Sequence, residues 1–290
     1  MGFFQWQYRK IRIFLKKFSI MLKIGILGSG SKGNSLIVST GQEAVLVDAG
    51  FSRRELLRRL GALGFDPGTI RCVLLTHEHT DHISGAPVFC DTLKIPLCAA
   101  GNVLTLLKRK KSRLPASLWS FEPGEQFNVG SFQIGTFPVQ HDATDPVGFV
   151  IGCGGIKVGI ATDLGEVSPM ARRSLVNTEV LVLESNYDPE MLRNSDRRPG
   201  LKNRINGFNG HLDNRSAARA LDCLLGDRSE LLLLAHRSCE CNTEELVREE
   251  ISRELSTLAR RDFPFAVLKQ EHCLKACRRP SGGFDLTEVM

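Results

Sequence analysis

The chain has 290 residues, 42% of them apolar, so it can bury a sizeable core as one large α/β domain or as two smaller ones, and we favour one. Its net charge of +6 argues only weakly for a nucleic-acid partner, because six basic residues and no acidic residue lie in the first 23, and the remainder is neutral. The nine scattered cysteines include no Cys-x-x-Cys pair, which argues against a zinc finger or a thioredoxin-type motif. Their odd number argues against a complete disulfide framework, and we expect a reducing compartment, the cytoplasm.

Residues 1–20 mix aromatic and aliphatic side chains with basic ones. They are compatible with an amphipathic surface helix, a weak membrane-interface anchor, an unstructured leader, or an extension that the fold does not use. They contain neither the apolar stretch of about 20 residues that spans a membrane nor a cleavage site typical of a signal peptide. We therefore predict an N-terminal extension at 1–20, one folded domain at 21–272 and a flexible C-terminal tail at 273–290.

The first strands surround a glycine-rich loop. A strand is predicted at 23–27, and two more, at 36–39 and 44–47, form a hairpin around Gly41. The loop at 28–35 lacks the spacing of a phosphate-binding P-loop and continues into a strand rather than a helix, so we reject that function. Its Ser31 and Asn34 are candidate substrate contacts. A helix with regularly spaced leucines is predicted over 52–64.

The apolar run at 72–75 leads directly into Thr76-His-Glu-His-Thr-Asp-His82, which holds three of the seven histidines of the chain. His77 and His79 leave an extended segment on the same side, and the turn that follows brings Asp81 and His82 round as a second set. Two sets of ligands on one loop predict two neighbouring divalent ions, zinc or manganese. A solvated polar loop is the alternative for any one histidine taken alone.

Two basic groups stand out. The helix expected at 102–111 ends in four basic residues, Lys108, Arg109, Lys110 and Lys111, and the run continues to Arg113. The second group lies further along the chain and consists of Arg193, Arg197, Arg198, Lys202 and Arg204. Each group is either a solvated surface or a contact to the phosphates of a polymer.

From Gln126 onward, short β runs alternate with helices, as in a second β-α half. The predicted strands are 132–139, 147–151, 156–161, 180–184, 231–235 and 265–268. The predicted helices are 168–175, one containing Met191 and Leu192, an alanine-rich one that follows Asn214 and ends near 225, and one from 242 or 243 to 258.

Polar residues follow three of these strands directly. His141 comes after the first, Asp163 after the third, and His236 after the strand at 231–235. Each therefore lies where a strand ends. Ser238 and Asn242, which come soon after His236, are candidate substrate contacts.

The pattern His-x-His-x-Asp-His after a strand, followed in order by His141, Asp163 and His236, resembles the signature of the metallo-β-lactamase fold superfamily. The resemblance implies an α/β fold, a four-layer αββα sandwich of two β-rich halves each flanked by helices. It implies one ion bound by His77, His79 and His141, a second bound by Asp81, His82 and His236, Asp163 as the carboxylate between them, and Asp48 as a support behind the histidine loop.

Three further segments are similar to the YycJ-type (WalJ) branch of this superfamily. They are Gly28 to Ser35, Glu184-Ser-Asn-Tyr-Asp188 with Met191-Leu192 after it, and Gly210-His-Leu-Asp-Asn214. Asp213 stands where the branch usually has serine, and both residue types can cap a helix. The resemblance covers roughly residues 22 to 270.

This branch implies a metal-dependent phosphodiesterase, and more narrowly a cytosolic exonuclease acting on DNA ends. Asp81 and His211 are the expected catalytic residues. His211 heads a helix between Asp163 and His236 in the sequence, as does the histidine that protonates a leaving oxygen in nuclease branches. The alternative that we favour less is a helix-start residue bonded to backbone. Hydrolysis of RNA, of a cyclic phosphodiester or of a thioester remains an alternative, as does a non-catalytic, metal-loaded regulatory protein.

Overall fold

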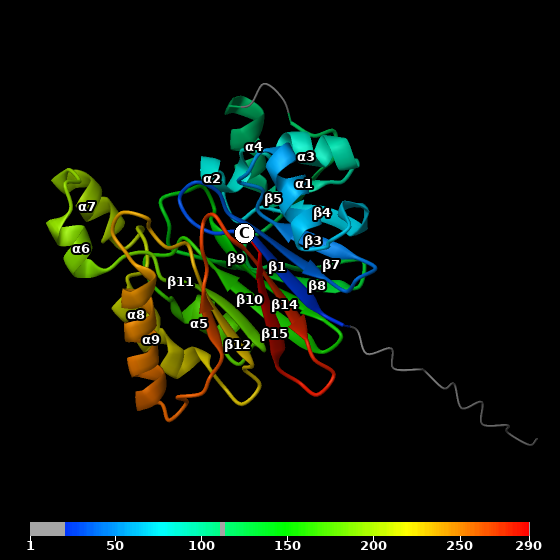
Figure 1. Ribbon diagram of the computed structural model, residues 1–290. Helices are drawn as coiled ribbons and strands as arrows, with labels where there is room; N and C mark the ends of the chain where they lie inside the picture. The colour runs from blue at the N-terminus through cyan, green and yellow to red at the C-terminus, as the bar shows by residue number, and fades with distance from the viewer. Residues whose placement is uncertain (1–20, 111–113, 290) are drawn as a thin grey trace, which may run out of the picture.

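Two β-sheets pack against each other in the computed structural model, which describes residues 21–110 and 114–289 (Figure 1). The first sheet has the strand order β15-β14-β1-β2-β3-β4-β5-β6 and the second the order β13-β12-β11-β10-β9-β8-β7. The strands of the first sheet are β1 (Lys23–Gly28), β2 (Ser35–Ser39), β3 (Ala44–Val47), β4 (Ile70–Leu74), β5 (Leu97–Ala100), β6 (Leu118–Phe121), β14 (Cys273–Arg278) and β15 (Phe284–Val289). Those of the second are β7 (Gln126–Val129), β8 (Phe132–Pro138), β9 (Val147–Cys153), β10 (Ile156–Ala161), β11 (Val180–Glu184), β12 (Leu231–Ala235) and β13 (Phe265–Val267).

Helices cover the outer face of each sheet, which confirms the predicted four-layer α/β class (Figure 1). The first sheet carries α1 (Arg53–Ala62), α3 (Ala86–Leu93) and α4 (Gly101–Lys110), and the second carries α5 (Pro169–Leu175), α8 (Asn214–Leu224) and α9 (Glu244–Thr257). The short α2 (Thr80–Ile83) follows the histidine loop, and α6 (Pro189–Asn194) and α7 (Pro199–Ile205) follow β11. No helix among the described residues is both long and apolar enough to cross a membrane.

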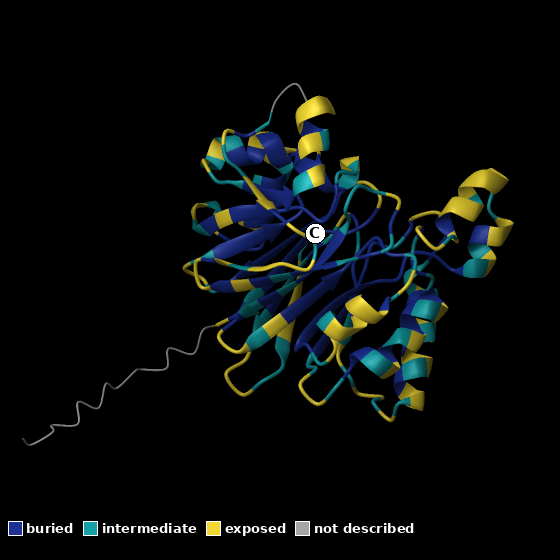
Figure 2. Ribbon diagram, turned by 180° about the vertical axis from the view of Figure 1, so that it is seen from behind, coloured by how far each residue is buried: buried dark blue, intermediate teal, exposed yellow. Residues whose placement is uncertain are grey.

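Strand β12 is apolar at every position. Leu231 and Leu233 enter the core between the sheets, whereas Leu232 and Leu234 enter the core beneath the helices. Both faces of the strand are therefore buried, as expected for parallel strands covered on two sides (Figure 2). Each leucine so buried contributes about 2 kcal/mol relative to an exposed one.

The helix α8 begins as the sequence predicts. Asp213 accepts hydrogen bonds from the amides of Arg215 and Ser216 at 2.9 and 3.0 Å, so the aspartate caps the helix in place of serine. This cap fixes the start of the helix just after His211.

The prediction of a flexible tail at 273–290 is wrong for its described part. Residues 273–289 form the hairpin β14–β15, and β14 pairs antiparallel with β1, with Ile24 opposite Ala276. Cys273 and Ala276 are buried beneath it. The folded domain therefore extends from 21 to 289 rather than to 272. The exposed residues of the hairpin suggested a tail, but the backbone of β1 provides the partner that orders it.

Other elements differ from the prediction. Strands β5, β6 and β7 were not expected, and the short helix predicted around Met191 is α6, which is followed by a second helix, α7. We call Pro189–Ile205 the α6–α7 arm, because it projects from the body and its surface is largely exposed (Figures 1 and 2). Its small core joins Leu192 and Ile205 to Tyr187 and Cys241. The predictions for 1–20 and for Lys111 lie outside the described residues.

Candidate metal centre

The predicted ligands converge on one edge of the sandwich, where β3, β4, β8, β10, β11 and β12 end. Parallel strands bring their carboxyl ends to the same edge, so residues far apart in the sequence meet there. Asp48, Asp163 and His236, which follow β3, β10 and β12, all have left-handed φ angles, of 57, 56 and 54°. Such a conformation is uncommon outside glycine and turns the chain sharply at each strand end, next to the cluster.

The histidine loop is held by backbone contacts. The amide of Asn34 donates to the carbonyl of Asp81 at 2.7 Å, and the amide of Ala49 donates to the carbonyl of His82, also at 2.7 Å. Gly50 lies so close that a Cβ there would be 1.7 Å from the Asp81 carbonyl oxygen. Only glycine permits this approach, which fixes the turn that separates the two sets of ligands.

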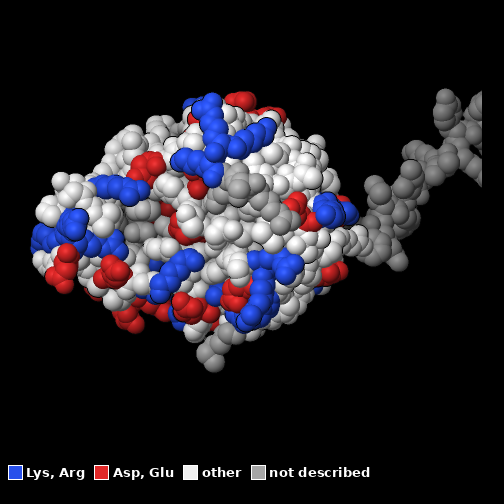
Figure 3. Space-filling model, turned by 90° about the horizontal axis from the view of Figure 1, so that it is seen from above, with Lys and Arg blue, Asp and Glu red and all other residues white. Residues whose placement is uncertain are grey.

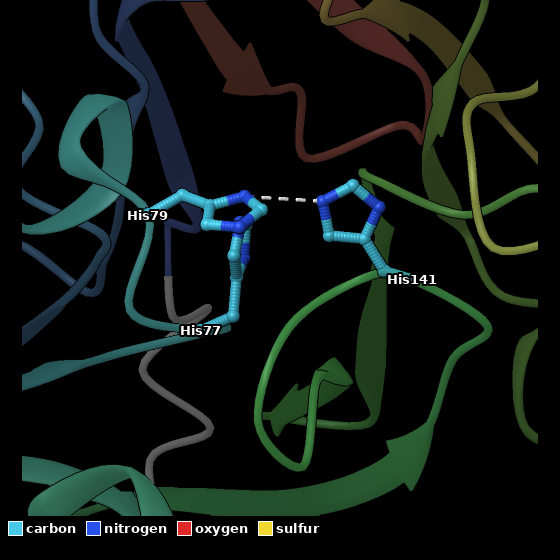
Figure 4. Close-up of side chains that lie close together, drawn as sticks. All are labelled: His77, His79 and His141. Carbon is cyan, nitrogen blue, oxygen red and sulfur yellow. Dashed lines mark hydrogen bonds between the residues drawn. The ribbon is translucent and has the colours of Figure 1, made fainter. Parts of the chain in front are cut away.

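His77, His79 and His141 form the first set. One ring nitrogen of each lies within 4.8 Å of the others, and His79 Nδ1 is 3.2 Å from His141 Nε2. Figure 4 shows His79 and His141 reaching toward each other from separate segments, with His77 beside His79. His77 Nε2 is buried and has no hydrogen-bond partner among the described residues. A buried nitrogen with no partner suits a metal ligand.

Asp81, His82 and His236 form the second set, again within 4.8 Å of one another. Asp81 Oδ2 lies 3.5 Å from His82 Nε2 and 3.4 Å from His236 Nε2. These are the two sets that the resemblance implies.

Asp163 lies between the two sets. Its Oδ2 is 3.1 Å from His82 Nε2, and its Oδ1 is 3.8 Å from His141 Nε2 and 3.3 Å from His236 Nδ1. The carboxylate is buried, and Oδ2 makes no hydrogen bond among the described residues. Asp163 Oδ2 and His77 Nε2 are thus two buried atoms without hydrogen-bond partners in the described part of the chain, and both are of the kind that coordinates a divalent cation. The residues present therefore fit such an ion.

Asp48 contacts the histidine loop from behind. Its Oδ2 lies 2.8 Å from His82 Nδ1, and its Oδ1 accepts a hydrogen bond from the amide of Thr76 at 2.9 Å. This contact orients the His82 ring so that Nε2 faces Asp81 and Asp163.

Glu184 is a site residue that the sequence reasoning missed. Its Oε1 lies 2.9 Å from both His211 Nδ1 and His236 Nδ1, and its Oε2 accepts hydrogen bonds from the amides of Leu164 and Leu212. The side chain is fully buried. The available signal was an acid at the end of the apolar strand 180–183, where a charged side chain must find partners.

His211 lies beside the cluster rather than within either set. Its ring centroid is 5.2 Å from that of His141 and 5.3 Å from that of His236, and its side chain is 21% exposed. Burial opposes its charged form, but Glu184 and Asp163 raise the pKa of His211 above its ordinary value.

Buried carboxylates dominate the electrostatics. Burial opposes protonation of His236, but Asp163, Asp81 and Glu184 outweigh it and raise the pKa of His236 to about 10. His77 shows the opposite balance, because burial is the largest influence and lowers its pKa. A divalent cation would supply positive charge to the same carboxylates, so its binding would release protons.

The candidate substrate contacts divide into separate groups. Asn34 is buried at the cluster, with Nδ2 3.3 Å from Asp81 Oδ2, whereas Ser31 is exposed on the same loop. Asn242 is buried and donates to the carbonyls of residues 185 and 186, and Ser238 Oγ accepts hydrogen bonds from the amides of residues 240 and 241. These two side chains hold neighbouring loops through backbone groups.

The basic residues Lys108, Arg109 and Lys110 are exposed at the end of α4. They therefore occupy a surface position separate from the buried ligands, and Lys111 is not described.

Comparison with known proteins places the chain in a family. Residues 43–236 match the Beta-lactamase superfamily domain. The chain is 31% identical over 235 residues to "Exodeoxyribonuclease YycJ" of Bacillus anthracis, which covers 81% of this chain and 89% of the relative. It is 32% identical over 240 residues to "Exodeoxyribonuclease WalJ" of Streptococcus pneumoniae, and that alignment covers 82% of this chain and 89% of the relative.

Among solved structures, the metallo-beta-lactamase fold protein YhfI of Bacillus subtilis superposes with a TM-score of 0.66 over 93% of this chain and all of that one, at 16% identity. That likeness concerns the fold alone. With the family match and the two relatives, it confirms the resemblance noted in the sequence: the chain belongs to the metallo-β-lactamase superfamily, in the branch that contains YycJ and WalJ.

Proposed function

We propose that this protein hydrolyses phosphodiester bonds at DNA ends with two divalent ions, zinc or manganese. His77, His79 and His141 would hold one ion, Asp81, His82 and His236 the other, and Asp163 both. The observation that carries the proposal is the position of the Asp163 carboxylate between two trios of ligand atoms. Two such ions lower the pKa of a water molecule and stabilise the charge that develops on the reacting phosphate.

The side chains of the chain supply the proton transfers. Asp81 is the most exposed of the three carboxylates in the cluster, at 23%, and accepts the proton of the attacking water. As the bond from phosphorus to the leaving sugar oxygen breaks, His211 donates a proton to that oxygen. Glu184 holds His211 by Nδ1, which leaves Nε2 for this transfer.

DNA is the favoured substrate because YycJ and WalJ, which align with more than four fifths of this chain, carry the name exodeoxyribonuclease. The basic end of α4 and the basic residues along the α6–α7 arm also favour a polyanionic substrate. The nine cysteines are free thiols, which supports a reducing compartment, and we propose the cytoplasm.

The test compares substrates on protein reconstituted with zinc or manganese. End-labelled duplex DNA, single-stranded RNA, bis-p-nitrophenyl phosphate and a thioester are offered to the wild type and to Asp163→Ala. We expect about two ions per chain and cleavage of DNA from an end in the wild type, with reduced metal content and no turnover in the variant. Thioester hydrolysis without DNA cleavage, or full activity in Asp163→Ala, would overturn the proposal.

A further inference from the structure

The α6–α7 arm is followed by an exposed aromatic residue beside the metal centre. Phe208 is 61% exposed, although it lies only three residues before His211. Single exposed hydrophobic residues are common on protein surfaces, so exposure alone assigns no role. The position of Phe208 and the rigidity of its loop are what set it apart.

The backbone around Phe208 packs directly against the ligand loops. A Cβ on Gly165 would lie 2.0 Å from the Phe208 carbonyl oxygen, so the two segments are in close contact. Gly165 follows Asp163 by two residues, and its amide donates to the carbonyl of Gln140, the neighbour of His141, at 2.9 Å. Phe208 therefore lies at the margin of the cluster.

Hydrogen bonds fix this loop. The amide of His211 donates to the carbonyl of Ile205 at 2.9 Å, and the amide of Gly210 donates to the carbonyl of Gly207 at 2.8 Å. The carbonyl of Gly210 lies 3.1 Å from His141 Nδ1. The exposed ring is thus carried on a preformed loop rather than on a freely moving one.

A cation lies on the same side of the centre. Arg204, on α7, donates through Nε to Asp142, and its side chain is 60% exposed. Asp142 Oδ1 lies 3.4 Å from His141 Nε2, which connects Arg204 to the first ligand set through one residue. The arm carries five basic residues against two acidic ones, so it attracts a polyanion.

We propose that Phe208 and Arg204 form a nucleotide subsite, in which Phe208 stacks on the base of the nucleotide on the leaving-group side and Arg204 binds its outer phosphate. The side follows from His211, the proton donor to the leaving oxygen, which is held in the same loop. The ligand is an unpaired terminal nucleotide of DNA, because a base within a duplex does not expose its face. This inference rests on the proposed function.

Stacking on an aromatic side chain is worth about 1–3 kcal/mol per base, which corresponds to a loss of about 5-fold or more when the ring or the base is removed. The test uses end-labelled oligodeoxynucleotides that carry an abasic residue on one side or the other of the terminal scissile phosphate. For the wild type, we expect kcat/KM to fall about 5-fold or more only when the abasic residue is on the leaving-group side. On the intact oligonucleotide, Phe208→Ala is expected to show the same fall in kcat/KM. An abasic residue on the leaving-group side should not lower the kcat/KM of this variant further. Phe208→Trp is expected to restore the preference for an intact base at that position.

Leu201→Ala and Arg253→Gln are the matched controls, because the first removes an exposed apolar side chain of the same arm outside the subsite and the second removes an exposed arginine of α9. Both are expected to cleave the oligonucleotide as the wild type does, whereas Arg204→Gln raises KM. Binding measured by fluorescence anisotropy of the labelled oligonucleotide is expected to follow the same order. Equal abasic losses in the wild type and Phe208→Ala would overturn the subsite while leaving DNA hydrolysis in place, and failure of the wild type to cleave DNA would overturn both proposals.

Discussion

Glu184 connects two histidines that have different proposed tasks. One oxygen faces both His211 and His236, and the other is occupied by two backbone amides, so the carboxylate has no freedom to rotate. His236 is a proposed ligand and His211 a proposed proton donor. Glu184 therefore orients the ring on which metal affinity depends and the ring on which departure of the leaving group depends.

Replacing Glu184 with glutamine keeps its size but removes its charge. We expect Glu184→Gln to lower metal affinity or activity about 10- to 100-fold, the usual effect of altering a ligand's orienting partner. Metal titration and kcat on DNA measure the two effects. Glu179→Gln is the matched control, because Glu179 lies just before the other end of the same strand, is buried, and accepts from the amide of Lys157. A fall in metal affinity of the same size in both variants would mean that loss of a buried charge, not orientation, is responsible.

The second residue-scale prediction separates the proton donor from the ligands. His211→Ala is expected to retain its metal and lose about 10²- to 10⁴-fold in rate on DNA, the usual contribution of a general acid. The loss is expected to be smaller on bis-p-nitrophenyl phosphate, because p-nitrophenolate leaves without a proton. His79→Ala is expected to lose metal instead, as elemental analysis would show. Equal rate losses on both substrates with normal metal content would exclude proton donation by His211.

At the scale of elements, α4 and the α6–α7 arm are two basic projections of the same molecule. Seen from above, basic side chains gather on the arm at the left and in another group near the upper edge, with acidic side chains between them and further basic side chains toward the lower edge (Figure 3). The ion pairs of the arm, such as Arg197 with Glu240, leave most of its charge exposed to solvent. Long DNA has more phosphates than the metal centre can contact, so such projections affect long substrates most.

Neutralising the end of α4 tests whether it contacts DNA. Changing Lys108, Arg109 and Lys110 to glutamine is expected to raise KM for long DNA and to reduce the slope of log affinity against log salt by about 1 for each phosphate that the helix no longer binds. Hydrolysis of bis-p-nitrophenyl phosphate is expected to stay unchanged. The control changes three exposed arginines of α8 and α9, namely Arg219, Arg248 and Arg253. A similar effect in the control would identify a general charge effect instead of direct binding.

At the scale of the whole molecule, the most reliable sequence signals were abrupt changes of polarity at strand ends. The apolar runs before His77, His141, Asp163 and His236 all form strands, and parallel packing then requires their ends to meet. Glu184 shows the same change of polarity, but a single acid has many uses, and only its contacts reveal which one applies here.

The elements that were missed depend on partners distant in the sequence. Strand β14 has two fully buried residues, Cys273 and Ala276, spaced by three, so it lacks the alternation that identifies a strand. Strand β5 has four residues, all buried between neighbours. These segments form strands because neighbouring strands pair with them, not because of their own local preference. A single sequence does not show which strands will lie side by side. Likewise, the polarity of Ser238 and Asn242 suggested substrate contact, whereas both satisfy buried backbone groups.

We expect opposite results from removing the hairpin β14–β15 and from removing the segment 1–20. Removing residues 273–290 exposes the edge of β1, and we expect the free energy of unfolding, typically about 5–15 kcal/mol, to fall by a large fraction or soluble protein to be lost. A protein beginning at Met21 is expected to fold and to retain turnover on short substrates. Urea denaturation compares both with the full chain. An unchanged urea midpoint after removal of 273–290 would show that the hairpin adds little to the domain.

The pairing of β1 with β14 also affects how the chain is made. Lys23 lies opposite Cys277, so β1 leaves the ribosome long before the strand that pairs with it. At synthesis rates of about 5–20 residues per second, that wait is about 10 to 50 s, during which one edge of β1 remains unpaired. The histidine loop is complete early in this interval, but His236 and the strand that closes the sheet arrive only near its end. The nascent chain therefore holds most of the proposed metal ligands before it has a finished fold, and unpaired strand edges in that period are the places where aggregation begins.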